Sequence, residues 1–302
     1  MDTRVGMLGL GIMGSAMSAN LLRAGFRVIG FDISAERLDA FAQAGGEAAR
    51  SARQVAQQAE LVIAVLPSVA ALDDVVSGAD GLLAAGRSGL ILVESSTFAI
   101  EQKQRVSALC RPGITMLDCP LSGTGAQALT GDLSVYASGD AQACERCAPV
   151  FAGFARSQHY LGEFGNGSKM KFVANLLVAI HNVATAEAFV LGMKAGLDPE
   201  MIYKVVGDGA GSSRMFQVRG PLMVSGEYEP ATMKVGIWQK DMKIISEFAA
   251  ALACPTPLLS ASAAYYTAAL AQGRGEQDTA AVCAVLEEMA CLQRAPSDTP
   301  SN

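Results

Sequence analysis

Short apolar segments alternate with longer amphipathic stretches through the first half of the chain. The apolar segments cover Arg4–Leu8, Arg27–Phe31, Leu61–Leu66, Leu90–Glu94, Thr115–Asp118 and Leu133–Ala137. Segments of this length and composition are typical of buried strands, and the stretches between them have the spacing of helices. The alternation predicts an α/β fold with a mostly parallel, doubly wound sheet, whose ligands bind at the carboxyl ends of the strands.

The second half of the chain has the pattern of a helical domain. Its longest predicted helix follows Gly165-Asn166-Gly167, runs from Ser168 to Ala195, and ends where Gly196 and Pro199 follow. Further helices are predicted at Glu200–Val206, Ser213–Met223, Lys243–Ala253, Pro255–Leu270 and Thr279–Leu292. A chain of 302 residues is longer than one hydrophobic core usually serves, so we expect two domains.

The long predicted helix carries polar residues within an otherwise apolar sequence. Lys171, Asn175 and Asn182 share one of its faces. In isolation, such residues usually join neighbouring helices, and the lysine extends its ammonium group to solvent. A membrane span is not expected, because Asn175, His181, Asn182 and Glu187 interrupt the apolar run.

The overall composition indicates which kinds of molecule the protein is expected to bind. The net charge of -6 argues against nucleic acid as the main partner. With 51% hydrophobic and 17% charged residues, the chain has apolar surface to cover in a homodimer or homotetramer. Residues 1–4 lead into a strand without a secretory signal pattern, and the seven cysteines follow no disulfide pattern, which favours the cytoplasm.

No metal site is expected. Cys144 and Cys147 form a C-x-x-C pattern, but zinc would require two more ligands. The two histidines of the chain, His159 and His181, have no paired spacing. We therefore place the two cysteines on the surface of a helix.

The first predicted strand runs directly into a glycine-rich turn and then into a helix. In this context Gly9 permits a tight turn, Gly11 lets the backbone approach a pyrophosphate, and Gly14 lets helix and strand pack closely. The helix N-terminus then faces the anion. The cofactor contacts predicted in this turn are Gly9, Leu10, Gly11, Ile12, Met13 and Gly14.

The second predicted strand ends in Asp32, where a carboxylate accepts hydrogen bonds from the ribose hydroxyls of an adenosine. The same carboxylate repels a 2′-phosphate, so we expect NAD rather than NADP. Arg37 lies near enough in the sequence to complicate this preference, but we interpret it as a solvated helix residue.

Three further turns follow predicted strands, at Leu66–Ser68, Ser95–Thr97 and Asp118–Gly125. We expect Leu66 and Pro67 to contact the cofactor, whereas the serines of the first two turns are ordinary turn residues. In the third turn, Ser122 and Gly123 offer a small hydroxyl group and exposed amides that suit a carboxylate.

Four motifs occur in one order along nearly the whole chain. They are Gly9–Gly14 with Met13 and Asn20, the turn Asp118-x-Pro-x-Ser-Gly, the stretch Gly165-x-Gly-x-x-x-Lys171-x-x-x-Asn175, and Lys240-Asp241. Together they resemble the β-hydroxyacid dehydrogenase family, whose members include 3-hydroxyisobutyrate dehydrogenase and tartronate semialdehyde reductase. The set is far more specific than any one of its motifs.

The resemblance implies a domain organisation. It implies an NAD-binding Rossmann domain over residues 1–163 and an all-helical substrate and oligomerisation domain over residues 164–294, built on the long central helix. The tail, residues 295–302, is polar and contains prolines, and we expect it to be disordered.

The resemblance also implies roles for individual residues. Lys171 is the general acid/base and Asn175 holds the substrate. Ser122 and Gly123 bind its carboxylate, with Thr124 beside them, and Thr97 and Lys240 lie by the nicotinamide half of the cofactor. A lysine ordinarily titrates near about 10.4, and we expect a cationic nicotinamide and an apolar helix to lower the pKa of Lys171.

The sequence therefore predicts an NAD-dependent oxidoreductase that transfers a hydride between the nicotinamide and a small 3-hydroxy acid or its semialdehyde. One alternative is an NADPH-dependent reductase of glyoxylate or of succinic or tartronate semialdehyde, which Asp32 opposes. Another is a non-catalytic dinucleotide-binding sensor, which Lys171, Asn175 and Lys240 together oppose. Thr124 and Ala174 replace a glycine and an asparagine of the family pattern, so the substrate's identity stays open.

Overall fold

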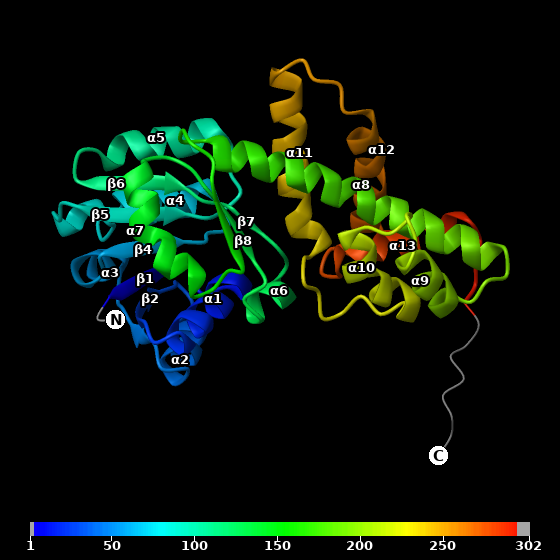
Figure 1. The fold of residues 1–302 in the computed structure, drawn as a ribbon, viewed down its shortest axis with the longest axis horizontal. Helices are drawn as coiled ribbons and strands as arrows, with labels where there is room; N and C mark the ends of the chain where they lie inside the picture. The colour runs from blue at the N-terminus through cyan, green and yellow to red at the C-terminus, as the bar shows by residue number, and fades with distance from the viewer. Residues whose placement is uncertain (1–2, 295–302) are drawn as a thin grey trace. The chain divides into compact units, whose positions relative to one another are not determined.

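The computed structural model describes residues 3–294 and divides the chain into two compact units, Met1–Ala174 and Asn175–Asn302. The division falls inside helix α8 (Asn166–Lys194), which contributes its first turns to one unit and the remainder to the other (Figure 1). The predicted boundary after residue 163 lies in the loop just before this helix. The predicted disordered tail lies outside the described residues.

A six-stranded parallel sheet forms the centre of the first unit, with the order β3-β2-β1-β4-β5-β6. The strands are β1 (Arg4–Leu8), β2 (Arg27–Phe31), β3 (Glu47–Ala48), β4 (Leu61–Ala64), β5 (Leu90–Glu94) and β6 (Ile114–Asp118). The direction of winding reverses between β1 and β4, which pair in parallel. The predicted doubly wound α/β fold is confirmed.

Both faces of this sheet are covered by helices, and the strand sequences explain why. Alternate residues of β1 point to opposite faces, so Val5 and Met7 belong to one hydrophobic cluster and Leu8 to another. In β4, Ile63 joins the first cluster and Val62 the second. The helices of this unit are α1 (Ile12–Arg23), α2 (Ala35–Gln43), α3 (Ala52–Gln58), α4 (Val69–Ser77), η1 (Leu83–Ala85), α5 (Ile100–Cys110), α6 (Gly125–Leu129) and α7 (Ala141–Ala152).

One predicted strand does not continue the main sheet. The segment Leu133–Ala137 forms β8 (Ser134–Ala137), which pairs antiparallel with β7 (Leu121–Ser122) and parallel with β9 (Ser157–Tyr160) in a separate three-stranded sheet. The prediction of one mostly parallel sheet is wrong for this segment. Its apolar pattern identifies a strand, but β7 is very short and β9 is polar, so neither partner has a strand signal of its own.

The C-x-x-C pattern occupies the buried face of α7. Cys144 and Cys147 are 6% and 0% exposed and belong to the hydrophobic core, so the predicted helix surface is wrong. Burial raises the pKa of Cys144 to about 11 and that of Cys147 to about 12. Both thiols therefore stay protonated and unreactive near neutral pH.

The second unit is helical, as predicted. It contains most of α8, followed by α9 (Pro199–Gly207), α10 (Arg214–Ser225), α11 (Val235–Ala251), α12 (Pro257–Ala271), η2 (Thr279–Ala281) and α13 (Val282–Met289). Helix α11 begins earlier than predicted, so Trp238, Lys240 and Asp241 all lie on it.

Polar contacts identify α8 as a core helix of this unit. Among the described residues, it is the one helix whose length and hydropathy would allow a membrane span. However, Asn182 is buried and its Nδ2 donates hydrogen bonds to Tyr266 Oη at 3.0 Å and to Thr279 O at 2.8 Å. The hydroxyl of Tyr266 in turn donates to Ala179 O at 3.1 Å. The NH₂ group of this amide is thus satisfied by residues of the same unit.

Two glycines allow α8 to begin where it does. Gly165 has a φ of 99°, in the left-handed region that favours glycine. Gly167 is buried, and a Cβ atom there would meet Tyr136 O and would lie 2.6 Å from Asp118 O and 3.0 Å from Pro120 Cδ. The first turn of α8 therefore lies directly against the backbone at the end of β6.

Replacing Gly167 with alanine should destabilise the first unit by about 2 to 4 kcal/mol, because two backbone carbonyls would have to move. Denaturant unfolding measures the change. Gly207→Ala is the control, because its Cβ would have Phe216 Cε1 as nearest neighbour at 3.9 Å. Equal stability of the two variants would contradict this account of the helix start.

Candidate functional site

The glycine-rich turn after β1 has the backbone geometry that its glycines predict. Gly9 has a φ of 89°, and a Cβ atom there would meet the carbonyl oxygen of Val65. A Cβ atom at Gly14 would meet the carbonyl oxygen of Gly9. Both positions therefore need glycine for close packing of β1, β4 and α1.

Gly11 is different, because its missing side chain leaves open space. The nearest heavy atom to a Cβ atom at this position is Arg37 Nη1 at 4.0 Å. Gly11 is also the N-cap of α1, whose first turn is Ile12-Met13-Gly14-Ser15. Room beside the backbone and the N–H groups of a helix start together fit the pyrophosphate of a dinucleotide.

Asp32 follows β2 and links the glycine turn to the next helix. Its side chain is almost fully buried, Oδ2 accepts a hydrogen bond from Leu10 N at 2.7 Å, and Oδ1 accepts one from Ser34 N at 2.9 Å. Arg37 Nη1 lies 3.6 Å from Asp32 Oδ2, and its side chain is 55% exposed. The interpretation of Arg37 as a solvated helix residue is thus incomplete, because Arg37 also pairs with the predicted ribose-binding carboxylate.

The turns after β4 and β5 are joined to each other. Leu66 N donates to Ser96 Oγ at 2.8 Å, and Ser96 N donates to Glu94 Oε1 at 2.9 Å. Ser96 therefore does more than terminate a strand, since it ties the turn that carries Pro67 to the turn that carries Thr97. These turns lie at the carboxyl edge of the sheet, where doubly wound folds bind their ligands.

The turn from Ser122 to Thr124 connects β7 to the short helix α6. Gly123 has a φ of 134°, and Thr124 is the N-cap of α6. Thr124 N donates to Gln127 Oε1 at 3.1 Å in a capping box. Thr124 thus stabilises this turn, which explains a threonine at a position where the family pattern has glycine.

The start of α8 is held by residues far away in the sequence. Ser168 N and Ser168 Oγ donate to Asp118 Oδ2 and Oδ1, both at 2.8 Å, and Gly167 N donates to Ser138 Oγ at 2.9 Å. Asp118, Ser138 and Ser168 are all buried. Lys171 is half-buried and lies one turn further along the same helix.

Asp118 is also a member of a buried cluster of charged side chains. The Nζ atom of Lys103 lies 2.6 Å from Glu94 Oε2, 2.8 Å from Asp118 Oδ1 and 2.7 Å from Ser96 O, and the three charged side chains are 0% exposed. Burial alone would lower the pKa of Lys103, but the carboxylates of Asp118 and Glu94 outweigh it and raise that pKa. Lys103 therefore stays charged well above neutral pH.

Sequence reasoning missed Lys103, Glu94 and Ser138. The signal for Lys103 was its spacing, because it lies three residues after Ile100 and three before Val106, on the buried face of α5. A lysine on an amphipathic helix is usually solvated, so this spacing alone did not single it out.

In the second unit, Asn175 and Lys240 are linked through Asp241. Asn175 Nδ2 donates to Asp241 Oδ2 at 3.0 Å, and Lys240 Nζ lies 3.7 Å from Asp241 Oδ1. Asn175 and Asp241 are buried, so a solvated helix face is excluded for Asp241. A carboxylate accepts hydrogen bonds only, which turns the amide oxygen of Asn175 away from Asp241.

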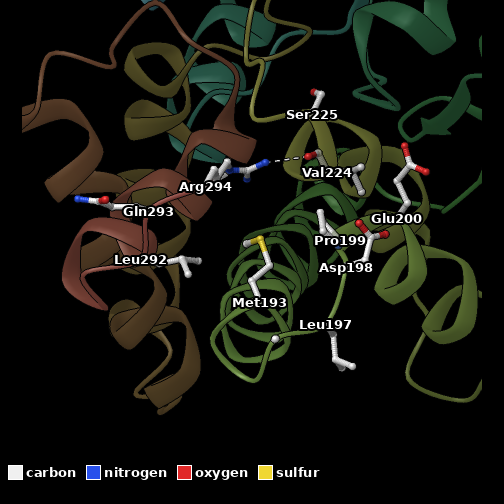
Figure 2. A pocket seen from close by; sticks show the side chains of 11 residues that line it. Met193, Leu197, Asp198, Pro199, Glu200, Val224, Ser225, Leu292, Gln293 and Arg294 are labelled. Carbon is white, nitrogen blue, oxygen red and sulfur yellow. Dashed lines mark hydrogen bonds between the residues drawn. The ribbon is translucent and has the colours of Figure 1, made fainter. Parts of the chain in front are cut away.

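A cavity of about 810 Å³ lies elsewhere in the second unit (Figure 2). It is lined by Met193, Gly196, Leu197, Asp198, Pro199, Glu200, Val224, Ser225, Leu292, Gln293 and Arg294. Arg294 Nη1 donates to Val224 O at 2.7 Å across it (Figure 2). None of the sequence-predicted site residues lines this cavity, and Arg294 there caps the end of α10.

Comparison with known families covers nearly the whole chain. A family model described as the NAD-binding domain of 6-phosphogluconate dehydrogenase matches residues 4–162. A second, described as NAD-binding of NADP-dependent 3-hydroxyisobutyrate dehydrogenase, matches residues 165–286. The two matches meet just before α8.

Individual relatives are similar over the same extent. An L-threonate dehydrogenase of Cupriavidus necator is 35% identical over 93% of this chain and 95% of its own length. An NAD-dependent L-serine dehydrogenase of Pseudomonas aeruginosa is 34% identical, with 92% and 96% covered. A crystal structure of 3-hydroxyisobutyrate dehydrogenase from Salmonella typhimurium superposes with a TM-score of 0.85 at 32% identity, over 94% of this chain and 100% of that one.

These matches agree with the geometry of the glycine turn, of Asp32 and of the strand-end turns. They make the protein an enzyme rather than a non-catalytic sensor, and they support the use of a nicotinamide dinucleotide. The chain belongs to the β-hydroxyacid dehydrogenase family and is an NAD(P)-dependent oxidoreductase acting on CH–OH groups.

Proposed function

We propose that the protein is an NAD-dependent dehydrogenase that interconverts a small 3-hydroxy acid and its semialdehyde, with Lys171 as the general acid/base. The observation that carries the proposal is the construction of α8. Lys171 and Asn175 lie one turn apart on this helix, its first turn is anchored to Asp118, and Asp241 orients the amide of Asn175. Because the helix is held at its first turn and at Asn175, Lys171 and Asn175 are well placed to contact the same small substrate.

The cofactor would be held by the carboxyl edge of the parallel sheet. We assign its contacts to Gly9, Leu10, Gly11, Ile12, Met13, Gly14, Asp32, Leu66, Pro67, Thr97 and Lys240. The open space at Gly11 and the free start of α1 suit the pyrophosphate, and Asp32 suits the adenosine ribose. When bound, the nicotinamide supplies the hydride acceptor or donor of the reaction.

Lys171 would move the proton that accompanies the hydride. In oxidation, its neutral amine accepts the proton of the substrate hydroxyl as the carbon–hydrogen bond breaks. In reduction, its ammonium returns a proton to the developing alkoxide. A general acid/base works best when its pKa lies near the working pH, so an amine beside a nicotinamide cation is well suited to oxidation.

The substrate carboxylate would bind at the turn that follows β7. Ser122 and Gly123 provide a hydroxyl group and backbone N–H groups there, and Thr124 fixes the turn through its capping box with Gln127. Asn175 would contact the substrate from α8. Small acids with a hydroxyl group on the third carbon fit this set, which is consistent with relatives named L-threonate, L-serine and 3-hydroxyisobutyrate dehydrogenase.

A second candidate is an NADPH-dependent reductase of glyoxylate or of succinic or tartronate semialdehyde. The pairing of Arg37 with Asp32 is the observation in its favour, because an exposed guanidinium beside the ribose site can attract a 2′-phosphate. Asp32 opposes it, since a carboxylate that is held at the ribose site by two backbone N–H groups repels the phosphate.

We further propose a cytoplasmic homodimer or homotetramer. Helices α8 and α9 expose large apolar side chains, with Leu191 74%, Val205 65% and Met201 56% accessible. Apolar side chains grouped in this way favour association.

Lys171→Ala should lower kcat by about 10²- to 10⁴-fold, the usual contribution of a general acid/base, and leave the Kd for NAD unchanged. Lys169→Ala is the matched control, because Lys169 is exposed and donates to Asn166 Oδ1 at 3.0 Å. Steady-state rates of NADH formation and a fluorescence titration with NAD measure the two quantities. Similar kcat values for the two variants would refute the role of Lys171.

Asp32→Ser should raise the ratio of kcat/KM with NADP to that with NAD by at least about tenfold, because it removes a repulsive charge and releases Arg37. Adding Arg37→Gln should cancel most of this gain. If the ratio of kcat/KM with NADP to kcat/KM with NAD is unchanged in Asp32→Ser, Asp32 does not select the cofactor.

A substrate panel tests the reaction class itself. With NAD, we expect NADH formation from at least one of 3-hydroxyisobutyrate, L-threonate, glycerate, 3-hydroxypropionate and L-serine, and no comparable rate from acids whose only hydroxyl group is on the second carbon, such as lactate. Faster reduction of glyoxylate or succinic semialdehyde with NADPH than of any of these acids' semialdehydes would favour the second candidate.

A further inference from the structure

We infer that Lys103, Glu94 and Asp118 form a positioning cluster that fixes the first turn of α8, and through it Lys171, relative to the turn that carries Thr97. This inference rests on the proposed role of Lys171. Its elements are all in the first unit, and they are joined there by ion pairs, hydrogen bonds and a close backbone approach.

The cluster is a closely paired buried network. The ammonium group of Lys103 donates hydrogen bonds to Asp118 Oδ1 and Ser96 O and forms an ion pair with Glu94 Oε2 at 2.6 Å. Two carboxylates face one ammonium, and the remaining negative charge lies on Asp118 at the N-terminus of α8, where the helix dipole favours it. Each charged group of the cluster thus has an oppositely charged partner inside the protein, and a displacement would separate them.

Stability alone does not account for such a cluster. Removing three charged groups from water is unfavourable, and well-packed apolar residues of similar size usually stabilise a core equally well. What a buried ionic network adds is a specific geometry, because any displacement leaves a charge unpaired in a low dielectric. A cluster at the edge of a proposed active site is therefore better explained by positioning than by stabilisation.

On one side, the cluster is bonded to α8. Asp118 accepts both the backbone N–H and the hydroxyl group of Ser168, and Gly167 lies against Asp118 O without room for a side chain. Lys171 lies three residues after Ser168, within the same rigid turn of helix. The position of the Lys171 backbone along and around the helix axis is thus set by Asp118.

On the other side, the cluster is bonded to the turn after β5. Ser96 O accepts from Lys103, Ser96 N donates to Glu94, and Ser96 Oγ accepts from Leu66 N. Thr97 and Pro67, both proposed cofactor contacts, are adjacent to these residues in the chain. The cluster therefore connects the residues that would hold the hydride acceptor with the helix that carries the proton acceptor.

Ser168→Ala tests this connection with little disturbance, because it deletes one hydrogen bond and places a good helix former in the first turn of α8. We expect kcat to fall about tenfold or more, as misplacement of a catalytic group does, while the Kd for NAD stays close to wild type. Ser168→Thr restores the hydroxyl group and should recover most of kcat. An unchanged kcat in Ser168→Ala, or a loss matched by an equal weakening of NAD binding, would overturn the inference.

A second pair of variants tests the charge balance. Lys103→Met leaves Glu94 and Asp118 facing each other without a cation, and kcat should fall more than in Ser168→Ala. Adding Glu94→Gln removes one of the two charges and should recover part of kcat. Arg105→Ala is the control: Arg105 lies on the same helix as Lys103 and forms an exposed ion pair with Asp73 of α4, so this variant should keep wild-type kcat. A double variant no more active than Lys103→Met would contradict the charge argument.

Lys171→Ala separates failure of the inference from failure of the proposed function. If Lys171→Ala keeps its kcat, the acid/base role is wrong and the cluster has no catalytic group to position. If Lys171→Ala is inactive while Ser168→Ala and Lys103→Met keep wild-type kcat, the proposed function stands and the positioning role is wrong.

Discussion

The buried carboxylate of Asp118 holds the start of α8, and the proposed position of Lys171 depends on it. It lies at the end of β6, where it accepts hydrogen bonds from Lys103, from the backbone of Ser168 and from the Ser168 hydroxyl group. An ionised carboxylate is tolerated in such a place only if every acceptor direction is used. The first turn of α8 supplies two of the donors, so the fold of the first unit and the start of the central helix are determined together.

The N-termini of two helices of the first unit, α1 and α8, are each suited to interact with a negative charge. At the start of α1, Gly11 leaves room beside the helix N-terminus, where we propose that the pyrophosphate of the cofactor binds. At the start of α8, the helix N-terminus faces the internal carboxylate of Asp118, which accepts a hydrogen bond from Ser168 N. In this proposal the first helix start serves to bind a ligand and the second to anchor the helix.

The amino-acid sequence predicts those features that depend on local pattern. The strands of the parallel sheet, the glycine turn and the long helix are of this kind, and so is the family, because Lys171 and Asn175 follow two glycines at a fixed spacing. Individual side-chain contacts were harder to predict, since a lysine at the helical spacing of Lys103 is usually solvated, and the closeness of Arg37 to Asp32 in the sequence does not show that the two form an ion pair. The short polar strand β9 was not predicted either, because its pairing with β8 depends on tertiary structure and not on its own sequence pattern.

The central claim is that Lys171 transfers the proton in a hydride-transfer reaction, and chemical rescue tests it most directly. The oxidation rate of Lys171→Ala would be measured with NAD, a substrate of the wild-type enzyme, and added primary amines of increasing basicity. The account predicts that small amines restore part of the lost kcat, and that the restored rate rises with the basicity of the amine. A Lys171→Ala variant that turns over at the wild-type rate without added amine would contradict it.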